Sequence, residues 1–414
     1  MAYADRVKLI AELEKKRGSK IITLILSDRS STTQFNGIQA TIAPDQVNQI
    51  VEHLKLFQGK KYSDELVELL IYTRGGDTNT AWILVNTIRN FAKKFNVLVP
   101  VFSHSAGTLI ALGANSIVMT RTASLSPIDP TVANAFNPKE GNVPQGISVE
   151  DVTSFMALAK DKDRVGVVSE KQLTEVFRIL AEKVHPLALG NVKRSHTQIR
   201  ILAKKLLELH INREKEKDRV EKIIDTLTEK FYTHYHLIFR KEAQDLGLTN
   251  VVEADEKEED ILWSIYKDYE AELKLKEFFD VNMFLGAKEE DTLETKTVFI
   301  ESTEKSSSLN IKQLIKRALL QDYGLRLQVL GMESQFAVNS GNLKIQIGNI
   351  IANLANLHAQ VVANPAIAGP MAPLLVHLQN AIGGLTQITG APNKLDTSDL
   401  KPIVEAKVLE IKWV

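Results

Sequence analysis

Residues 69–130 constrain the fold more than any other stretch, because two small-residue turns each separate an apolar run from a helical pattern. The first run ends at Gly75-Gly76, and the second ends just before Ser105. This repeated order of strand, turn and helix predicts a βαβα unit with parallel strands. Open parallel sheets bind ligands at the carboxyl ends of their strands. We therefore expect both turns to lie at one functional edge of the sheet.

Composition narrows the classes of function. The chain has 414 residues, which is enough for two or three domains and a large core. Its 51 basic and 51 acidic residues give no net charge, so we expect no nucleic-acid partner. It has no cysteine, which excludes disulfides and thiolate catalysis. No His, Asp and Glu cluster has metal-ligand spacing, and we expect neither a metal nor another cofactor.

The N-terminal segment and the short apolar runs of the sequence argue against a membrane protein. Residues 1–20 resemble a charged amphipathic helix rather than a signal peptide. No stretch reaches about 18 consecutive apolar residues, the length that a membrane span needs. We expect no integral membrane span and a cytoplasmic location.

The turn at Ser105 has the parts of a nucleophile site. A serine hydroxyl is a weak nucleophile, which needs a nearby base and N–H donors for the developing oxyanion. Ala106 and Gly107 would keep the approach to Ser105 open, and backbone N–H groups at a helix start are unpaired. Gly75 and Gly76 lack a β-carbon, so a peptide substrate can approach closely there. A single Ser-Ala-Gly turn is more often an ordinary loop, but two such turns at equivalent strand ends favour a site.

The same stretch resembles the serine dehydrogenase proteinase family, which belongs to the Clp-protease/crotonase superfamily and is related to signal peptide peptidase A. The matching segments are Thr73-Arg74-Gly75-Gly76, Ser105-Ala106-Gly107-Thr108-Leu109-Ile110-Ala111-Leu112, Ala114-Asn115-Ser116-Ile117-Val118-Met119, Ser126-Pro127-Ile128-Asp129-Pro130, Tyr232-Thr233-His234 with Glu242-Ala243 and Leu246-Gly247-Leu248, and Phe299-Ile300-Glu301-Ser302. One departure is Ser126, where the family usually has glycine. The resemblance spans about residues 20–305.

The resemblance implies an α/β fold with a repeated ββα spiral core and flanking helices, which form a Clp/crotonase-like serine peptidase domain (20–305). The residue pattern outside this range predicts an N-terminal helix (1–19) and a mostly helical C-terminal appendage (306–414). The appendage is poor in charge and is a candidate region for oligomerisation or partner binding. We expect it either to pack on its own catalytic body or to make a homo-oligomer.

The resemblance also implies Ser105 as the nucleophile, with oxyanion donors from the Gly75-Gly76 turn and from the Ala106 N–H. The base is left open. Clp-type proteases use a histidine shortly after the nucleophile's helix and strand, but this chain has none there. Signal-peptide-peptidase relatives use a lysine, for which Lys139 and Lys160 are candidates. A solvated surface lysine is the more common role for either, because a lysine base must be desolvated.

Histidines offer another base. His234 matches a threonine-histidine segment of the family. His236 lies two positions later, so on an extended segment both side chains would point to the same face. His104 precedes Ser105 directly, and neighbours on an extended segment point to opposite faces, so it is poorly placed. Asp129 fits the Pro-Ile-Asp-Pro turn better than the orientation of a base.

Three hypotheses for the function result. The first is an endopeptidase that hydrolyses peptide bonds through an acyl-enzyme on Ser105 and needs no ATP by itself. The second is a catalytically inactive scaffold of the same fold, acting through oligomerisation or partner binding. The third is acyl-CoA chemistry of the crotonase kind, against which a serine at the nucleophile turn argues.

Overall fold

The computed structural model describes the whole chain except residues 1–2, 32–37, 129–130, 133–135, 138, 141–142, 145, 162–165, 167–168, 232–234, 320–342, 364–374, 378 and 383–401. The main strands are β1 (Lys20–Leu26), β2 (Leu66–Tyr72), β3 (Lys94–Val99), β5 (Ser116–Met119), β12 (Val251–Glu253), β13 (Glu290–Glu301), β14 (Ser306–Leu319) and β15 (Pro402–Trp413). The helices are α1 (Tyr3–Arg17), α2 (Asp45–Phe57), α3 (Thr78–Phe91), α4 (Ala106–Leu112), α5 (Val149–Lys160), α6 (Glu170–Lys183), α7 (Pro186–Leu207), α8 (Lys217–Asp225), α9 (Arg240–Leu246), α10 (Glu256–Glu272), α11 (Val281–Leu285) and α13 (Leu343–Val362), with a π-helical turn η1 (Thr226–Lys230).

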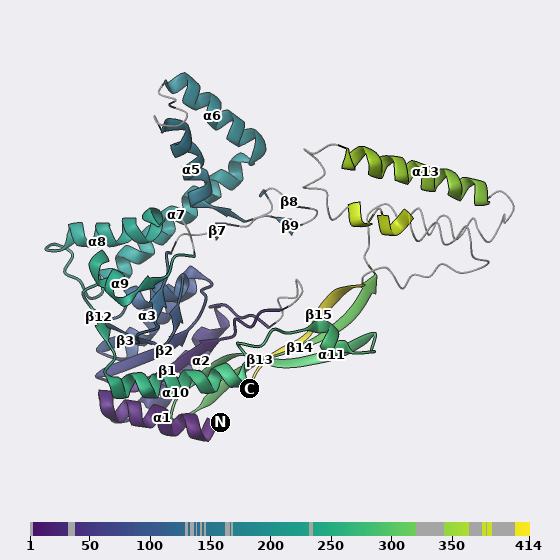
Figure 1. Cartoon of the computed structure of the whole chain (residues 1–414). Coiled ribbons are helices and arrows are strands. Elements are labelled where there is room, and N and C mark those ends of the chain that lie inside the picture. Colours follow the sequence, from purple (N-terminus) through teal and green to yellow (C-terminus); the bar gives the residue numbers. More distant parts are fainter. Residues whose placement is uncertain are drawn as a thin grey trace. The chain divides into compact units, whose positions relative to one another are not determined.

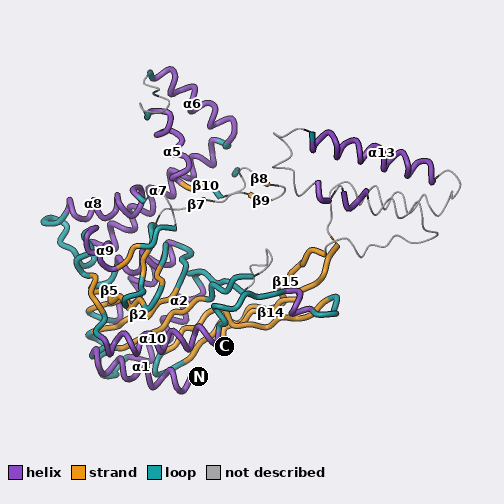
Figure 2. Tube along the Cα trace, in the orientation of Figure 1, coloured by secondary structure: helices purple, strands orange, loops and turns teal. Residues whose placement is uncertain are grey.

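One eight-stranded sheet organises the fold, with the strand order β12-β5-β3-β2-β1-β13-β14-β15 (Figures 1 and 2). The strands from β12 to β1 pair in parallel, and β13 adds antiparallel to β1. The intervening chain forms helices, as parallel strands require. The expected α/β fold class is confirmed, and so are the strands and helices that the sequence predicts between residues 69 and 119.

Both faces of the central strands are buried, because neighbouring side chains along each strand alternate between two cores. Leu24 and Leu69 face a core that α2, α3, α4 and α7 help to enclose. Ile25 and Leu70 face a second core, which α1 and α10 cover. Figure 1 shows α1 and α10 side by side on that face. Such continuous apolar strands are typical of a sheet covered on both faces.

A smaller sheet continues from the carboxyl ends of the main strands. It has the order β11-β6-β4, with β4 (Phe102–Ser103), β6 (Ser124–Leu125) and β11 (Ile238–Phe239). Two short hairpin pairs follow, β7 (Thr131–Val132) with β10 (Ile147–Ser148), and β8 (Lys139–Glu140) with β9 (Val143–Pro144). The small sheet holds the segment after β3 beside the segment after β5, so it brings distant parts of the sequence to the strand ends.

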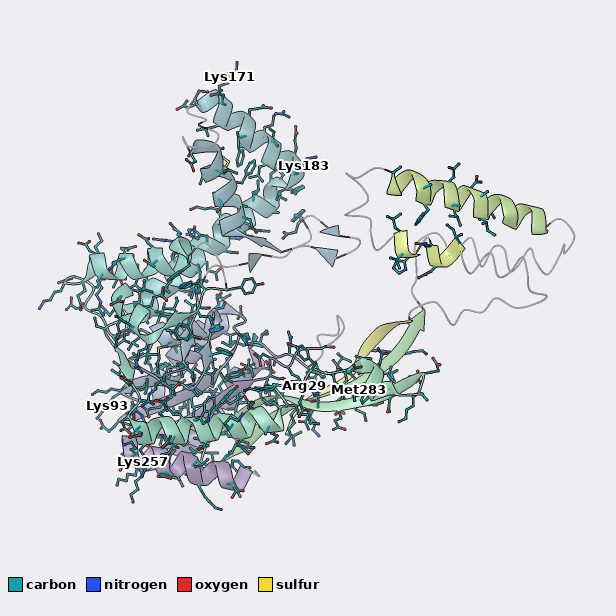
Figure 3. The ribbon with its side chains drawn as sticks, in the orientation of Figure 1. Arg29, Lys93, Lys171, Lys183, Lys257 and Met283 are labelled. Carbon is teal, nitrogen blue, oxygen red and sulfur yellow. The ribbon has the colours of Figure 1, made fainter. Side chains whose placement is uncertain are left out.

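The helices α5 and α6 pack on each other, and α5 also contacts α7. No residue of α6 is buried, although its apolar side chains recur at helical spacing, and Phe177 is 50% exposed. Figure 3 shows Lys171 and Lys183 at the two ends of this helix. Within the part of the chain that the structure describes, no helix is both long and apolar enough to cross a membrane.

The chain divides into two compact units. One comprises Met1–Phe284, Leu293–Gln313 and Val408–Val414, and the other comprises Leu285–Thr292 and Leu314–Lys407. In the first unit, the chain end is tied to β14, because Ser308 and Val414 exchange two backbone hydrogen bonds of 2.7 and 2.8 Å. The second unit contains the helix α13. The division predicted at residue 305 stays a prediction.

Candidate active site

The two turns predicted from the sequence follow strand ends that are hydrogen-bonded to each other. Beyond β2, Thr73 forms an isolated parallel bridge with Ser103. The Thr73 N–H donates to the Phe102 carbonyl (3.2 Å), and the His104 N–H donates to the Thr73 carbonyl (3.1 Å). The residues that follow on the two strands are therefore held side by side.

Ser105 has an unusual backbone, with φ 51° and ψ −112°, directly before α4. A non-glycine residue in such a conformation is strained, and such residues cluster at functional sites. The Ser105 N–H donates to Ser126 Oγ at 2.8 Å. Its side chain is partly exposed, and no residue that the structure describes hydrogen-bonds the Ser105 hydroxyl. A held backbone with an available hydroxyl is what a nucleophile needs.

Gly75 provides a close approach to Ser105. Its φ angle is 121°, and a β-carbon there would lie 2.7 Å from Ser105 Cβ and 3.2 Å from Ser105 Oγ. The Gly75 N–H donates to Thr73 Oγ1 at 3.0 Å, and its carbonyl accepts from the Ile42 N–H at 2.8 Å. Both backbone polar groups of Gly75 are thus engaged within the fold.

Gly76 presents its own N–H on the other side of the chain. It forms a parallel bridge with Ile42, whose carbonyl accepts from the Asp77 N–H at 2.8 Å. A β-carbon on Gly76 would lie 2.4 Å from the Ile42 nitrogen. Backbone groups of successive β-residues point in opposite directions, so the N–H of Gly76 points away from Ile42. Ala106 is the first residue of α4, and its N–H has no intrahelical acceptor.

Gly107 packs closely against the strand ends, and its expected part in keeping the approach to Ser105 open stays a prediction. A β-carbon there would lie 2.6 Å from Thr73 Cγ2 and 2.8 Å from Ser103 Oγ. Only glycine lets α4 come so close to the strand ends. The Gly107 N–H donates to the His104 carbonyl at 2.8 Å, which closes the turn around Ser105.

The three candidate bases differ in what the structure says of them. Lys160 is the exposed last residue of α5 and makes no hydrogen bond to Ser105. The backbone of Lys139 lies in β8, but its side chain is outside the described part of the chain. His234 lies outside the described residues altogether, as does Asp129.

Two other histidines are engaged elsewhere. His104 is 7% exposed, and its Nε2 lies 3.0 Å from Ser124 Oγ. Its ring packs 4.8 Å from the ring of Phe102. The His236 ring stacks on Phe231 at 4.3 Å, and His236 Nε2 lies 2.8 Å from Glu242 Oε1. Each of these imidazoles is hydrogen-bonded to a partner other than Ser105.

A positive group precedes the glycine turn. The Arg74 guanidinium lies 4.0 Å above the Phe102 ring, and Arg74 Nε donates to Asp28 Oδ2 at 2.6 Å. The same carboxylate accepts from the Tyr72 hydroxyl at 2.9 Å. Burial, with the Asp28 charge next to it, raises the pKa of Tyr72 far above its usual value. Tyr72 therefore stays a neutral donor, and Arg74 is the cation nearest in sequence to the turn.

Ser126 is the site residue that sequence reasoning missed. Its only signal in the sequence is the departure from the glycine that the resemblance leads one to expect. Its contact with Ser105 depends on the approach of β6 to the start of α4, which no local pattern encodes.

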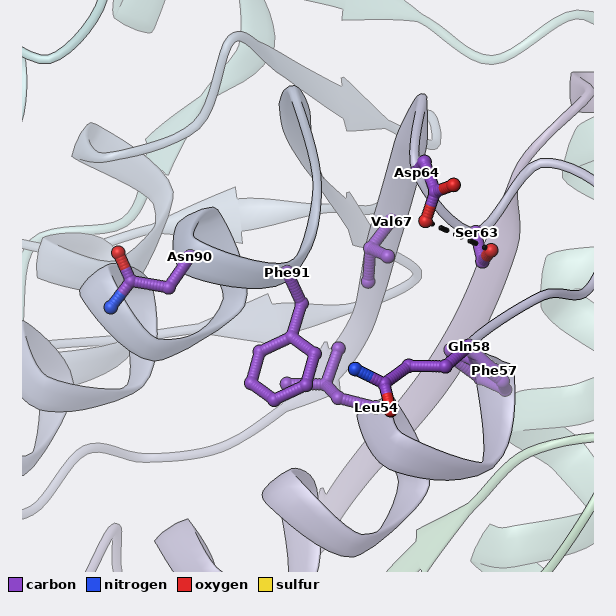
Figure 4. Close-up of a pocket in the computed structure, with 8 residues that line it drawn as sticks. All are labelled: Leu54, Phe57, Gln58, Ser63, Asp64, Val67, Asn90 and Phe91. Atoms are coloured by element: carbon purple, nitrogen blue, oxygen red, sulfur yellow. Dashed lines mark hydrogen bonds between the residues drawn. The ribbon is translucent and has the colours of Figure 1, made fainter.

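One cavity lies at the opposite end of the strands. It has a volume of about 270 Å³ and is lined by Leu54, Phe57, Gln58, Ser63, Asp64, Val67, Asn90 and Phe91 (Figure 4). Its residues flank the start of β2, whereas Ser105 lies beyond the carboxyl end of that strand. The position of this cavity therefore argues against its being the binding site for a substrate of Ser105. Among the described residues, no group of three or more His, Asp or Glu side chains is arranged to hold a metal ion.

Comparison with known proteins shows what the N-terminal part of the chain is similar to. Residues 1–162 match the ClpP-like SDH-type serine proteinases. The uncharacterized protein MJ0137 of Methanocaldococcus jannaschii is 27% identical over 251 residues, which cover 60% of this chain and 75% of that protein. The uncharacterized protein MJ1495 of the same organism is 26% identical over 181 residues, or 43% of this chain and 59% of that protein. The resemblance expected from the sequence is thus confirmed.

Two solved structures show weaker likeness. A mutant of the 1510-N membrane-bound stomatin-specific protease is 16% identical, with a TM-score of 0.30, over 52% of this chain and 75% of that chain. ClpP1 from Listeria monocytogenes is 15% identical, with a TM-score of 0.30, over 60% of this chain and 98% of that chain. The likeness to serine proteinases therefore rests on the match over residues 1–162.

Proposed function

Because residues 1–162 match the ClpP-like SDH-type serine proteinases, we propose that the chain is a serine peptidase that hydrolyses peptide bonds with Ser105 as the nucleophile. The observation that carries this proposal is the strained backbone of Ser105, at φ 51°, packed against Gly75. Strain of this kind persists only where the surrounding structure enforces it. The reaction would need no ATP by itself.

The proposed reaction has two steps. Ser105 Oγ attacks the carbonyl carbon of the scissile peptide bond while its proton passes to the base. The C–N bond then breaks, the base gives its proton to the leaving amine, and an ester on Ser105 remains. In the second step the base takes a proton from water, whose oxygen attacks the ester carbon. The bond between that carbon and Ser105 Oγ then breaks, Oγ takes the proton back from the base, and the peptide leaves with a new carboxyl end.

We assign the oxyanion donors to the N–H groups of Gly76 and Ala106. The Gly75 N–H, which the sequence also suggests, is held by Thr73 Oγ1, and the Ser105 N–H is held by Ser126 Oγ. In other enzymes, the removal of one preorganised oxyanion donor raises the barrier of the reaction by about 3–4 kcal/mol. We expect each of these two N–H groups to stabilise the tetrahedral intermediate by a similar amount.

Among the three candidate bases, we favour His234. The described residues on either side of it are anchored to the segment around Ser126. The Ile128 N–H donates to the Leu227 carbonyl at 3.0 Å, and Ile238 pairs with Leu125 in the small sheet. Lys139 is the second choice. The exposed Lys160 is the third, because a lysine base needs burial to lose its proton near neutral pH.

We also infer that the active form is a homo-oligomer acting on peptide or protein substrates. Exposed apolar side chains on both α5 and α6 support this proposal, since Leu158 is 46% and Phe177 is 50% exposed. Apolar side chains of this size become buried when two copies of a chain associate. The cytoplasmic location stays a prediction.

Reaction of the intact chain with a fluorophosphonate probe tests the proposal. The native protein should be labelled, mass spectrometry should place the label on Ser105, and Ser105→Ala should abolish it. Ser124→Ala is the matched control, because that buried serine bonds His104 instead. No labelling of the native protein at any pH would overturn the peptidase and favour the inactive scaffold.

The base is identified by the pH dependence of the same labelling. His234→Gln, Lys139→Met and Lys160→Met each remove one candidate. The variant that lowers the labelling rate by about a hundredfold or more, and abolishes its dependence on pH, identifies the base.

A further inference from the structure

Ser126 joins the nucleophile to the end of the small sheet. It follows β6 directly, and its side chain is almost completely buried, at 2% exposure. Its Oγ accepts the N–H of Ser105 at 2.8 Å and donates to the Pro127 carbonyl at 3.0 Å. One hydroxyl therefore connects the backbone of the nucleophile to the turn that follows β6.

Ser126 is itself held firmly in place. Its N–H donates to Thr108 Oγ1 at 3.1 Å. The Thr108 hydroxyl in turn shares its proton between the carbonyls of Ser126 (3.0 Å) and Ser103 (2.9 Å). Thr108 is fully buried in α4, so the network links β4, α4 and β6 around the turn of Ser105. A satisfied network of this kind fixes its members in one arrangement.

The acceptor at Ser126 has a specific consequence for Ser105. A buried N–H without an acceptor is costly, so a neighbouring acceptor selects the backbone conformation that reaches it. The Ser105 N–H also adjoins the N–H of Ala106. When the first is occupied, only the second can reach an oxyanion from this turn.

We propose that Ser126 is a positioning residue for the nucleophile. Its hydroxyl holds Ser105 in the left-handed conformation that presents Oγ at the turn, and it reserves the Ala106 N–H as the oxyanion donor. This inference rests on the proposed peptidase function. Alanine at 126 would leave the Ser105 N–H facing a methyl group. The turn would then relax toward an ordinary loop, with Oγ displaced from its line of attack.

The test separates reactivity from affinity. Inactivation by a fluorophosphonate probe is measured over a range of probe concentrations, which gives a maximal rate of labelling and a half-saturating concentration. Ser126→Ala should lower the maximal rate about tenfold or more, because a buried donor loses its partner. The half-saturating concentration and the pH dependence should stay as in the native protein, since neither the probe contacts nor the base change.

Two further variants control the experiment. Ser126→Thr keeps the hydroxyl and should recover part of the rate. Ser103→Ala is the matched control, because Ser103 is also fully buried near the turn, but its hydroxyl has no hydrogen-bond partner among the described residues. It should label at the native rate. Thermal unfolding of all variants shows that each is folded at the assay temperature.

The outcomes distinguish this inference from the proposed function. If the native protein is labelled and Ser126→Ala is labelled equally fast, the positioning role is wrong and the peptidase stands. If Ser126→Thr is as slow as Ser126→Ala while both are folded, the hydroxyl is not the cause and the inference is again overturned. If the native protein is not labelled, the peptidase proposal fails. Hydrogen exchange at the Ser105 amide then decides the structural part, because Ser126→Ala should lose its protection.

Discussion

Gly75 packs so closely against Ser105 that a β-carbon on the glycine would lie 2.7 Å from the β-carbon of the serine. Real β-carbons do not approach one another at this distance, so the contact exists only because residue 75 is glycine. Its φ angle of 121° adds a second reason, since side-chain-bearing residues rarely adopt it. The glycine turn and the serine turn are therefore one structural unit.

Gly75→Ala should disable the site. The added methyl group must push Ser105 away or distort the glycine turn, and both shift Oγ relative to the Gly76 and Ala106 donors. We expect fluorophosphonate labelling to fall by about a hundredfold or more, because displacements of about 1 Å cost that much. We expect a loss of about 1–3 kcal/mol in the free energy of unfolding, measured in urea.

Gly59→Ala is the matched control for backbone strain alone. Gly59 also has a positive φ, of 76°, but a β-carbon there would meet nothing within 4 Å. It should lose about 1–2 kcal/mol of stability and keep native labelling. Equal labelling of Gly75→Ala and the native protein would show that the two turns are not coupled.

His104 should be dispensable for chemistry although it adjoins the nucleophile. Its Nε2 bonds Ser124 Oγ at 3.0 Å inside the fold, and its ring packs against Phe102. We expect His104→Gln to change the labelling rate by less than about threefold and to cost about 1–3 kcal/mol of stability, because a buried partner is disturbed. A hundredfold loss of labelling at unchanged stability would instead make His104 the base.

The sequence predicts local parts of this site well. The strand before Gly75, the helix after it and the helix after Ser105 all follow from apolar periodicity interrupted by glycine, and β2, α3 and α4 lie where that pattern puts them. These signals are local, since each depends on residues within one element and its bounding turn.

What the sequence does not predict depends on contacts between distant segments. The Ser126 hydroxyl reaches the Ser105 N–H across 21 residues of sequence. Thr73 Oγ1 takes the Gly75 N–H, which changes the choice of oxyanion donor. The C-terminal appendage, which its composition predicts to be mostly helical, also contains the strand β15, which forms the edge of the large sheet. In each case the deciding partner belongs to another element.

A buried ion network ties the first helix to the sheet, and breaking it should destabilise the protein strongly. Arg6 is 2% exposed; its Nε donates to Glu301 Oε2 at 2.7 Å and its Nη1 to Asp268 Oδ2 at 2.6 Å. Both carboxylates are buried as well. Arg6→Ala should cost about 3–5 kcal/mol, because it leaves two buried charges without their partner.

Lys8→Ala is the control on the same helix. Lys8 pairs with Asp5 at 3.0 Å, but the two side chains are 77% and 43% exposed. Exposed pairs contribute little, so the variant should lose less than about 1 kcal/mol in urea unfolding. A similar, small loss in Arg6→Ala would mean that α1 does not need the network to stay attached.

His53 should make the stability of the protein depend on pH between about pH 6.5 and pH 4. The side chain is fully buried, and its Nδ1 lies 2.8 Å from Ser302 Oγ. Burial, helped by the Lys305 charge, lowers the pKa of His53 from 6.5 to about 4, against the weaker opposing effects of the Ile300 backbone and the Glu52 charge. The unfolded chain therefore binds a proton in this range that the folded protein excludes.

The folded protein is therefore most stable while His53 is neutral. The contribution of His53 to the free energy of unfolding is fully present above pH 6.5 and is lost as the pH drops toward 4, by about 3 kcal/mol at most. Urea unfolding at about pH 7.5 and about pH 5 should differ by about 2 kcal/mol more in the native protein than in His53→Gln, which cannot titrate. Because surface carboxylates titrate equally in both proteins, the comparison isolates His53. Parallel losses of stability in the two proteins would show that His53 accepts a proton as readily in the fold as in the unfolded chain.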